Sequence, residues 1–301
     1  MVTPLFILGK QRSGTTWLAN QLCRHPDIAG IQHQRHFGIH ESAYFSSVMG
    51  RYGSLKVPEN FVEFVKVMAG SDYFRLAGVS EEFLLSMWTT GYAEIFRAVM
   101  NHFAEKSGAK YWLEKTPAHT PLVDTLANIY PDALFIGIFR NPQEVAASSL
   151  KLETNENPNT VNSKFKRKLF ISRNILSLSY YNKKLKSFQK RSDRIYTVEY
   201  KEMKFDLEKT LHHICQHLGL PWNDAVLGQS YKPNTGFKEK SERKALITNS
   251  EKRMIAILTL LGKSTPLIAY EAMNRIKKSF NSRRSLPEAF FRLTNLEQEQ
   301  S

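Results

Sequence analysis

The stretch PLFILGKQRSGTTWLANQL, residues 4–22, decides the fold of this chain. Its first part, 4–8, is an apolar run with the length of a buried strand, and residues 15–25 place apolar side chains at helical spacing. Between them, GKQRSGTT (9–16) carries a GxxxxG pattern, and in this context backbone N–H groups and a helix N-terminus converge on an anion. The stretch therefore predicts a strand, an anion-binding loop and a helix. A tight turn before a capped helix is the simpler alternative.

Strands and helices alternate along the rest of the chain. We expect strands at 28–32, 110–114, 133–139 and 194–200, and helices at 81–106, 121–130, 141–150, 160–191 and 205–219. Strands separated by helices indicate an α/β fold in which helices cover both faces of a parallel sheet. After Pro221 the pattern weakens.

The domain organisation follows from length and composition. We expect a single domain over 1–280, with a helix-prone, aromatic-rich insertion at 41–107 and a flexible tail at 281–301. A content of 42% hydrophobic and 23% charged residues excludes a wholly disordered chain. Two cysteines cannot build a disulfide framework, and no apolar run approaches the ~20 residues of a membrane helix. The N-terminus enters a strand at once, which indicates a cytoplasmic protein.

The positive charge is unevenly placed. The net charge is +14, and residues 160–204 carry 13 Lys and Arg against 3 Asp and Glu. A field of this sign attracts polyanions or anionic small molecules. A solvated basic helix face explains the same pattern.

The loop at 9–16 differs from a Walker A loop, in which a lysine follows the second glycine and reaches the outer phosphates. Here Thr15 and Thr16 follow Gly14, and the cation is Arg12. The loop therefore predicts binding of a 5′-phosphate without the usual contact to a γ-phosphate.

A second anion site is predicted after the strand at 133–139. Arg140 follows this strand at its carboxyl end, where open α/β sheets bind ligands, and Ser148 lies two turns into the helix that Pro142 starts. A guanidinium fork and a hydroxyl can converge on one phosphate. An arginine that only caps the sheet edge is the alternative.

These segments together resemble the sulfotransferases that use 3′-phosphoadenosine 5′-phosphosulfate (PAPS). Residues 9–18 resemble the family's 5′-phosphosulfate loop, 139–150 its 3′-phosphate segment, and 198–221 the strand and helix near the adenine. The resemblance implies a P-loop-like α/β fold, PAPS as donor, 3′-phosphoadenosine 5′-phosphate (PAP) as product, and no metal. The donor-binding residues it implies are Gly9, Arg12, Ser13, Gly14, Thr15, Thr16 and Trp17 on the 5′ side, Arg140 and Ser148 at the 3′-phosphate, and Tyr200 at the adenine.

Sulfuryl transfer needs an in-line attack, cations that neutralise the sulfonate and the leaving phosphate, and usually a base. WLEKTPAH (112–119) resembles the EKTP segment of the glycan-modifying and bacterial branches. The resemblance makes Lys115 the candidate for stabilising the bridging oxygen, and Arg12 is a second candidate cation. A lysine that pairs with Glu114 or another surface carboxylate is the alternative.

The base is expected in HPDIAGIQHQRHF (25–37), which resembles a segment in which the heparan-type branch carries a glutamate. Gln34 stands at that position, and a neutral amide cannot accept a proton. We therefore expect His36 to be the base, with His119 second and His33 a further candidate. An acidic acceptor, such as a phenol or an amine, needs no strong base.

The remaining parts of the predicted site have no decisive spacing. TGFKEKSERK (235–244) offers Lys238, Lys240 and Arg243 to the nucleotide. The aromatic-rich segment 44–103 is the candidate acceptor cap, although most of its aromatics fit a plain helix core. The expected partners are the donor nucleotide and a carbohydrate, lipid or small-molecule acceptor, with a peripheral contact to an anionic surface and no nucleic acid.

Two other function classes compete with this reading. A P-loop kinase or NTPase is disfavoured because the Walker lysine is missing and because the strand at 133–139 ends in Arg140, which repels a metal. A non-enzymatic module that binds polyanions would explain the charge of 160–204. It would not explain a phosphate loop in the nearly neutral first half of the chain.

Overall fold

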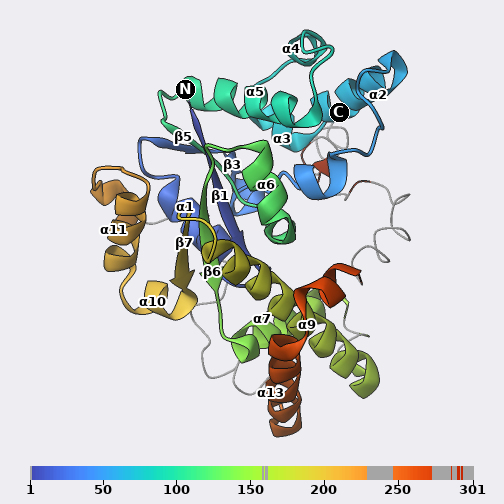
Figure 1. Cartoon of the computed structure of the whole chain (residues 1–301), viewed down its shortest axis with the longest axis vertical. Coiled ribbons are helices and arrows are strands. Elements are labelled where there is room, and N and C mark those ends of the chain that lie inside the picture. The colour runs from blue at the N-terminus through green and yellow to red at the C-terminus, as the bar shows by residue number, and fades with distance from the viewer. Residues whose placement is uncertain are drawn as a thin grey trace.

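Figure 1 shows the computed structural model of the chain, which describes residues 2–157, 159, 162–228, 247–272, 286, 290, 291 and 293. Among these residues, five parallel strands pair in the order β2-β5-β1-β6-β7. They are β1 (Thr3–Gly9), β2 (Ile28–Gly30), β5 (Tyr111–Glu114), β6 (Leu134–Phe139) and β7 (Ile195–Glu199). The short strands β3 (Gln32–His33) and β4 (Gly38–Ile39) form a separate antiparallel pair. The predicted parallel sheet is confirmed.

The central strand β1 explains why both faces of the sheet are covered. Successive side chains of a strand point to opposite faces, and Leu5, Phe6, Ile7 and Leu8 are all fully buried. Phe6 and Leu8 join one core cluster, whereas Leu5 and Ile7 join a second one. The first cluster includes residues of α6 (Val123–Ile129) and α9 (Lys164–Gln189), and the second includes residues of α1 (Thr15–Leu22), α10 (Tyr200–Phe205) and α11 (Leu207–His217). The prediction of helices on both faces is confirmed.

The segment between β4 and β5 is helical, as predicted. It contains η2 (Tyr44–Val48), α2 (Pro58–Ala69), α3 (Asp72–Leu76), α4 (Glu81–Leu85) and α5 (Tyr92–Glu105). Its aromatic side chains pack on one another, with the Phe96 ring centroid 4.7 Å from that of Tyr44 and 4.9 Å from that of Phe45. These rings belong to the first core cluster, so they are structural, as expected for most aromatics here.

The prediction of one continuous helix over 81–106 is wrong. The helix is interrupted between α4 and α5, where Thr89 has a φ of 78° and Gly91 caps the start of α5. A left-handed backbone at Thr89 is incompatible with a continuing right-handed helix. The helical spacing of apolar residues therefore continues through 81–106 and gives no sign of the interruption between the two helices.

The chain after Pro221 contains more structure than the sequence indicated. Helix α13 (Asn249–Ser264) begins with a capping box of Thr248 and Glu251 and packs against α9 and α7 (Pro142–Glu156). In the segment predicted as a flexible tail, Phe290 is buried in the first core cluster, and Leu286 and Phe291 pack against it. The apolar side chains of these described residues therefore lie against the core.

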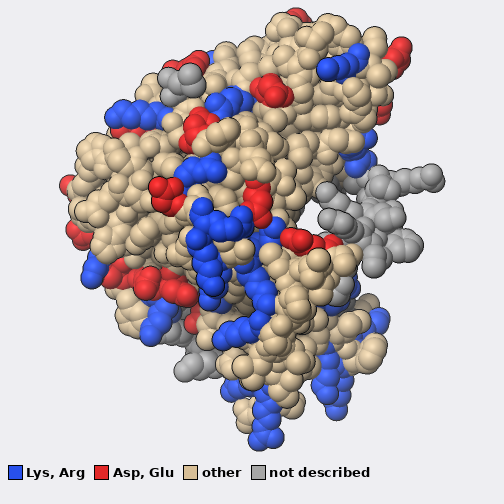
Figure 2. Space-filling view, in the orientation of Figure 1, with Lys and Arg blue, Asp and Glu red and all other residues tan. Residues whose placement is uncertain are grey.

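The surface reflects the uneven charge of the sequence. Figure 2 shows Lys and Arg side chains gathered over the carboxyl-terminal part of α9 on this face. Of the basic residues near the end of α9, Lys184 pairs with Asp124 and Glu271, and Arg191 pairs with Asp124. Within the described part of the chain, no helix is long and apolar enough to cross a membrane.

Candidate functional site

The loop that follows β1 is held at the carboxyl edge of the sheet. The backbone N–H of Gly9 donates to Thr120 Oγ1 at 2.8 Å, and the Thr120 hydroxyl donates back to the Gly9 carbonyl at 3.1 Å. Thr120 lies in the turn η3 (Pro117–Leu122), so this turn fixes the start of the loop. The Ser13 hydroxyl is fully buried and has no hydrogen-bond partner among the described residues. An unpaired buried hydroxyl in a loop is a place for a ligand.

Gly14 has to be glycine for two reasons. Its φ of 101° lies in the left-handed region, and a Cβ atom would sit 2.6 Å from the ring of Tyr200. Tyr200 begins α10, at the end of β7, and its ring also lies edge-on to Trp17, with centroids 6.0 Å apart. The chain segments around residues 14 and 200 are therefore in direct contact.

Arg140 joins these segments to the end of β6. Its guanidinium donates to the carbonyl of Arg12 at 2.7 Å and lies over the ring of Tyr200 at 3.7 Å from the centroid. Its Nε atom also pairs with Glu144 at 3.0 Å. The side chain of Arg12 in turn donates from Nε to Ser148 Oγ at 2.9 Å. Contacts therefore link the side chains of Arg140, Arg12 and Ser148, and guanidinium and hydroxyl groups are donors that suit a phosphate.

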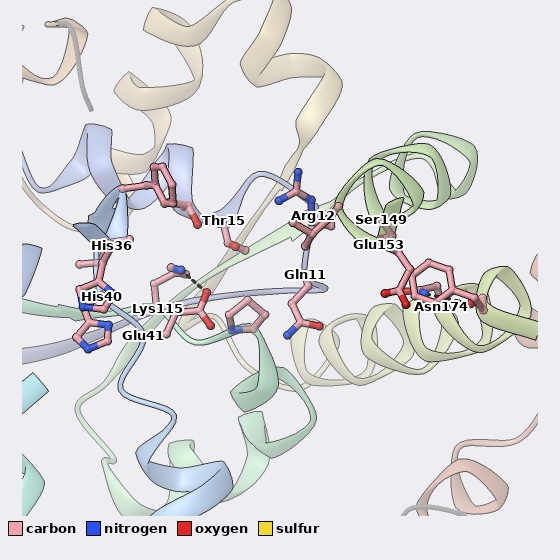
Figure 3. Close-up of a pocket in the computed structure, with 16 residues that line it drawn as sticks. Gln11, Arg12, Thr15, His36, His40, Glu41, Lys115, Ser149, Glu153 and Asn174 are labelled. Carbon is pink, nitrogen blue, oxygen red and sulfur yellow. Dashed lines mark hydrogen bonds and ion pairs between the residues drawn. The ribbon is translucent and has the colours of Figure 1, made fainter. Parts of the chain in front are cut away.

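A cavity of about 490 Å³ opens beside the loop (Figure 3). It is lined by residues of the loop, of the chain around β4 and β5, and of α7 and α9: Gln11, Arg12, Thr15, Thr16, His36, Phe37, Ile39, His40, Glu41, Lys115, Pro117, Ser149, Leu152, Glu153, Phe170 and Asn174. Lys115 is 1% exposed, and its Nζ donates to Glu41 Oε1 at 2.5 Å. Figure 3 shows this pair between the two histidines and the phosphate loop.

A buried polar network lies behind Lys115. Glu114 has no exposure, and it accepts hydrogen bonds from Ser42 at 2.7 Å, from Thr116, and from His119 Nδ1 at 2.9 Å. Burial raises the pKa of Glu114, but the neighbouring His119 and these three hydrogen bonds outweigh burial and hold the pKa below its usual value. Glu114 is therefore a buried anion that ties the chain around Ser42 to the segment 114–119.

His36 and His40 form a second cluster on the cavity wall. Their rings stack, with centroids 3.7 Å apart and planes 15° from parallel. His36 Nε2 is 3.4 Å from Oδ2 of Asp72, whose side chain has no exposure. Although these three residues could in principle hold a metal ion, nearly parallel rings cannot both direct a nitrogen lone pair at one ion. The arrangement fits a stacked pair with a carboxylate rather than a chelate.

Comparison with known proteins agrees with this geometry. A family model described as the sulfotransferase family matches residues 4–224. The chain belongs to the sulfotransferase family. The curated relatives include nodulation protein NoeE of Sinorhizobium fredii, 30% identical over 49% of this chain, and protein-tyrosine sulfotransferase 1 of Danio rerio, 27% identical over 74%. The chain covers only 32% and 55% of the lengths of these two proteins.

A solved structure supports the fold of this chain. The sulfotransferase domain from the curacin biosynthetic pathway superposes with a TM-score of 0.50 at 16% sequence identity, over 75% of this chain and 77% of that one. At this identity the likeness concerns the fold alone. It agrees with the P-loop-like α/β architecture that the sequence predicts.

The structure brings most of the predicted site residues together. Around the loop and the ends of β6 and β7 lie Gly9, Arg12, Ser13, Gly14, Thr15, Thr16, Trp17, Arg140, Ser148 and Tyr200. Arg12, predicted on the 5′ side, points its guanidinium at Ser148, which is a predicted 3′-phosphate residue. Lys115 and His36 line the adjoining cavity. Lys238, Lys240 and Arg243 lie outside the described residues.

The placement of His119 argues against its predicted role as a base. Its side chain is fully buried, does not line the cavity, and pairs with Glu114. A group in this position cannot receive a proton from an acceptor in the cavity. His119 therefore supports the segment that carries Lys115.

Sequence reasoning missed Glu41, His40 and Asp72. Glu41 follows the segment in which a base was expected, and no motif marks it. The only available signal was the position of a carboxylate a few residues after His36. Asp72 comes from the helical insertion, and only the folded chain shows that it meets His36.

Proposed function

We propose that this sulfotransferase moves a sulfuryl group from PAPS to a hydroxyl or an amine of an acceptor. The observation that carries the proposal is the convergence of Arg12, Arg140, Ser148 and Tyr200 beside the loop at 9–14. These residues come from three distant segments, and each has the chemistry that its part of the donor requires. The carboxyl edge of a parallel sheet is also where such ligands bind.

The donor side fits an adenine nucleotide with phosphates at both the 5′ and the 3′ positions. Thr15, Thr16 and the backbone N–H groups at the start of α1 would hold the 5′-phosphosulfate, and the buried hydroxyl of Ser13 would gain a partner there. Arg140 and Ser148 would hold the 3′-phosphate, with Arg12 close enough to share it. The rings of Tyr200 and Trp17 offer an apolar surface for the adenine.

The transfer step then needs only groups that this chain provides. An oxygen or nitrogen of the acceptor attacks the sulfur, the bond between sulfur and the bridging oxygen breaks, and PAP leaves with that electron pair. Lys115 is placed to stabilise the charge on the bridging oxygen, since its ammonium has two further N–H donors besides the one given to Glu41. His36 takes the proton of the acceptor.

The acceptor occupies the part of the cavity beyond the loop. Leu152 and Phe170 give this part apolar walls, while Glu153 and Asn174 add polar groups. Carbohydrate, lipid and small-molecule acceptors all fit this mixed lining. The name of one relative, a protein-tyrosine sulfotransferase, adds a phenol to the acceptors that should be screened.

The proposal is tested by calorimetric titration with PAP and, separately, with ATP and magnesium. We expect micromolar binding of PAP, weak or absent binding of magnesium-ATP, and weaker binding of adenosine 5′-phosphate, which lacks the 3′-phosphate. Tight magnesium-ATP binding with indifference to the 3′-phosphate would overturn the proposal in favour of a kinase or NTPase. Salt-dependent binding of a polyanion such as heparin, with no nucleotide binding, would favour a polyanion-binding module instead.

A further inference from the structure

Asp72 is a buried carboxylate that faces the candidate base. It is the first residue of α3 and is 1% exposed. Its Oδ2 atom lies 3.4 Å from Nε2 of His36, which is an ion-pair distance rather than hydrogen-bond geometry, and the His36 side chain is itself 7% exposed and lines the cavity. A carboxylate without exposure needs partners that justify its burial.

The second partner of Asp72 comes from the far end of the chain. The backbone N–H of Leu293 donates to the same Oδ2 atom at 2.9 Å. This contact is held by packing, because Phe290 is buried in the first core cluster and Leu286 and Phe291 pack against that cluster. In Figure 1 a small dark red piece of the chain lies near α3, in agreement with the contact between Leu293 and Asp72. A residue of the helical insertion thus bridges the C-terminal segment and the cavity wall.

The carboxylate determines where the proton of a neutral His36 lies. A neutral imidazole carries one proton, and a carboxylate beside Nε2 keeps it on that nitrogen. Nδ1 is then left as the atom that can accept a proton. The other groups around His36 are the stacked ring of His40, the edge of His33, and Lys115 and Glu41 in the same cavity.

We propose that Asp72 is a positioning residue that keeps the proton of His36 on Nε2, and that the C-terminal segment holds Asp72 in place through the Leu293 N–H. The catalytic consequence rests on the proposed function, in which His36 accepts the proton of the acceptor. The structural part does not, because the protonated nitrogen of His36 can be observed without any substrate.

The first test observes the ring nitrogens of His36 directly. The full chain is labelled with ¹⁵N-histidine, and long-range ¹H–¹⁵N spectra are recorded at a pH where His36 is neutral, with the His36→Gln spectrum providing the assignment. We expect the Nε2–H form in the wild type and a mixture of both forms in Asp72→Asn. Unchanged His36 nitrogen signals in a folded Asp72→Asn protein would overturn the proposal.

A matched pair of variants tests the C-terminal segment. Leu293→Pro removes the backbone N–H that Asp72 accepts, whereas Leu293→Ala keeps it and shortens the side chain. We expect Leu293→Pro to shift His36 toward the mixture and Leu293→Ala to leave it in the Nε2–H form. Equal effects of both variants would show that packing alone matters and would overturn this part. The pair also keeps the proposal testable if Asp72→Asn does not fold.

Measurements of turnover then distinguish the positioning role of Asp72 from the proposed sulfuryl transfer. Turnover of PAPS to PAP should fall by at least about 10-fold in Asp72→Asn, with the Kd for PAP unchanged, because the carboxylate acts through His36 and touches no nucleotide. Rescue of turnover by Asp72→Glu would support a positioning role. A changed proton position with unchanged turnover would contradict His36 as the base and leave the structural part standing. Absence of PAP binding in the wild type would contradict only the proposal that PAPS is the donor, and not the role of Asp72.

Discussion

The part of the site proposed to bind the nucleotide and the part proposed to bind the acceptor, called below the nucleotide half and the acceptor half, are built in different ways. In the nucleotide half, the backbone of the loop at 9–14 and the ends of β6 and β7 set the geometry, and Arg140 contacts a backbone carbonyl and a ring. In the acceptor half, side chains make contacts across distant segments: Lys115 pairs with Glu41, and Asp72 meets the ring of His36 and the backbone N–H of Leu293. A site whose geometry is set by the backbone of a loop leaves a recognisable local pattern in the sequence. A site that depends on contacts between side chains of distant segments leaves no such pattern.

The largest expected effect is on stability, at the buried anion of the acceptor half. Glu114→Gln should lower the free energy of unfolding by about 3–5 kcal/mol at pH 7, because a neutral amide replaces the buried carboxylate that accepts three hydrogen bonds. The folded-state pKa of Glu114 is lowered, so its contribution is present above the ordinary value of 4.5 and is lost as the pH falls through the folded-state value. The difference between wild type and variant should therefore shrink in acid.

Urea unfolding at pH 7 and at several pH values below 4.5 measures this difference. Glu105→Gln, at an exposed position at the end of α5, is the control and should change stability little. If Glu114→Gln lowers the free energy of unfolding by the same amount at every pH, the shape of the Glu114 side chain rather than its charge stabilises the acceptor half.

The next effect is on catalysis and separates the two halves. Lys115→Ala should lower turnover by about 100-fold to 1,000-fold, the usual loss when one donor to a developing charge is removed. Affinity for PAP should change far less, because the residues proposed to hold the phosphates lie in the other half. Stopped assays of PAP formation and calorimetry give the two numbers.

Lys110→Ala is the matched control, since this exposed lysine pairs with Asp27 at the surface and does not line the cavity. It should leave both turnover and affinity near the wild-type values. Equal losses of turnover and PAP affinity in Lys115→Ala would make Lys115 a binding residue and would remove the functional distinction between the halves.

The same distinction explains how much the sequence could predict. The sequence could place the loop, Arg140 and Ser148 at the sheet edge because each follows a recognisable strand, and their roles toward a nucleotide stay a prediction. The sheet was found because its apolar strands are short and clearly bounded. Glu41 and Asp72 were missed because their importance comes from contacts with Lys115 and His36. No periodicity encodes such contacts between separate segments.

Helix α13 and the C-terminal segment were missed for a related reason. Ile257, Leu260 and Leu261 of α13 are exposed, so the apolar residues of this helix do not mark a single buried face. Phe290 and Leu293 are bound by the insertion and by Asp72, which lie far away in the sequence. The position of His119 behind Glu114 was likewise set by the fold and not by its motif.

A third prediction concerns the nucleotide half alone. Arg140→Ala should weaken PAP binding by about 2 kcal/mol, roughly 30-fold, because a charge-assisted contact to the 3′-phosphate is lost. Binding of adenosine 5′-phosphate, which has no 3′-phosphate, should change much less. Calorimetry with both nucleotides measures the difference, and Arg191→Ala, at an exposed arginine of the basic surface, is the control. An equal loss for both nucleotides would contradict the 3′-phosphate role.

The smallest expected effect tests whether backbone conformation really sets the nucleotide half. Gly14→Ala should cost about 1–2 kcal/mol of stability, because an L-residue is strained at a φ of 101°. It should also weaken PAP binding, since the new Cβ would displace the ring of Tyr200. In the double variant with Tyr200→Ala the steric part disappears, whereas the backbone strain remains. Unfolding and PAP titration of the two single variants and the double variant therefore separate the two causes. Strictly additive losses would show that the ring does not constrain Gly14, and the nucleotide half would then depend on side chains no less than the acceptor half.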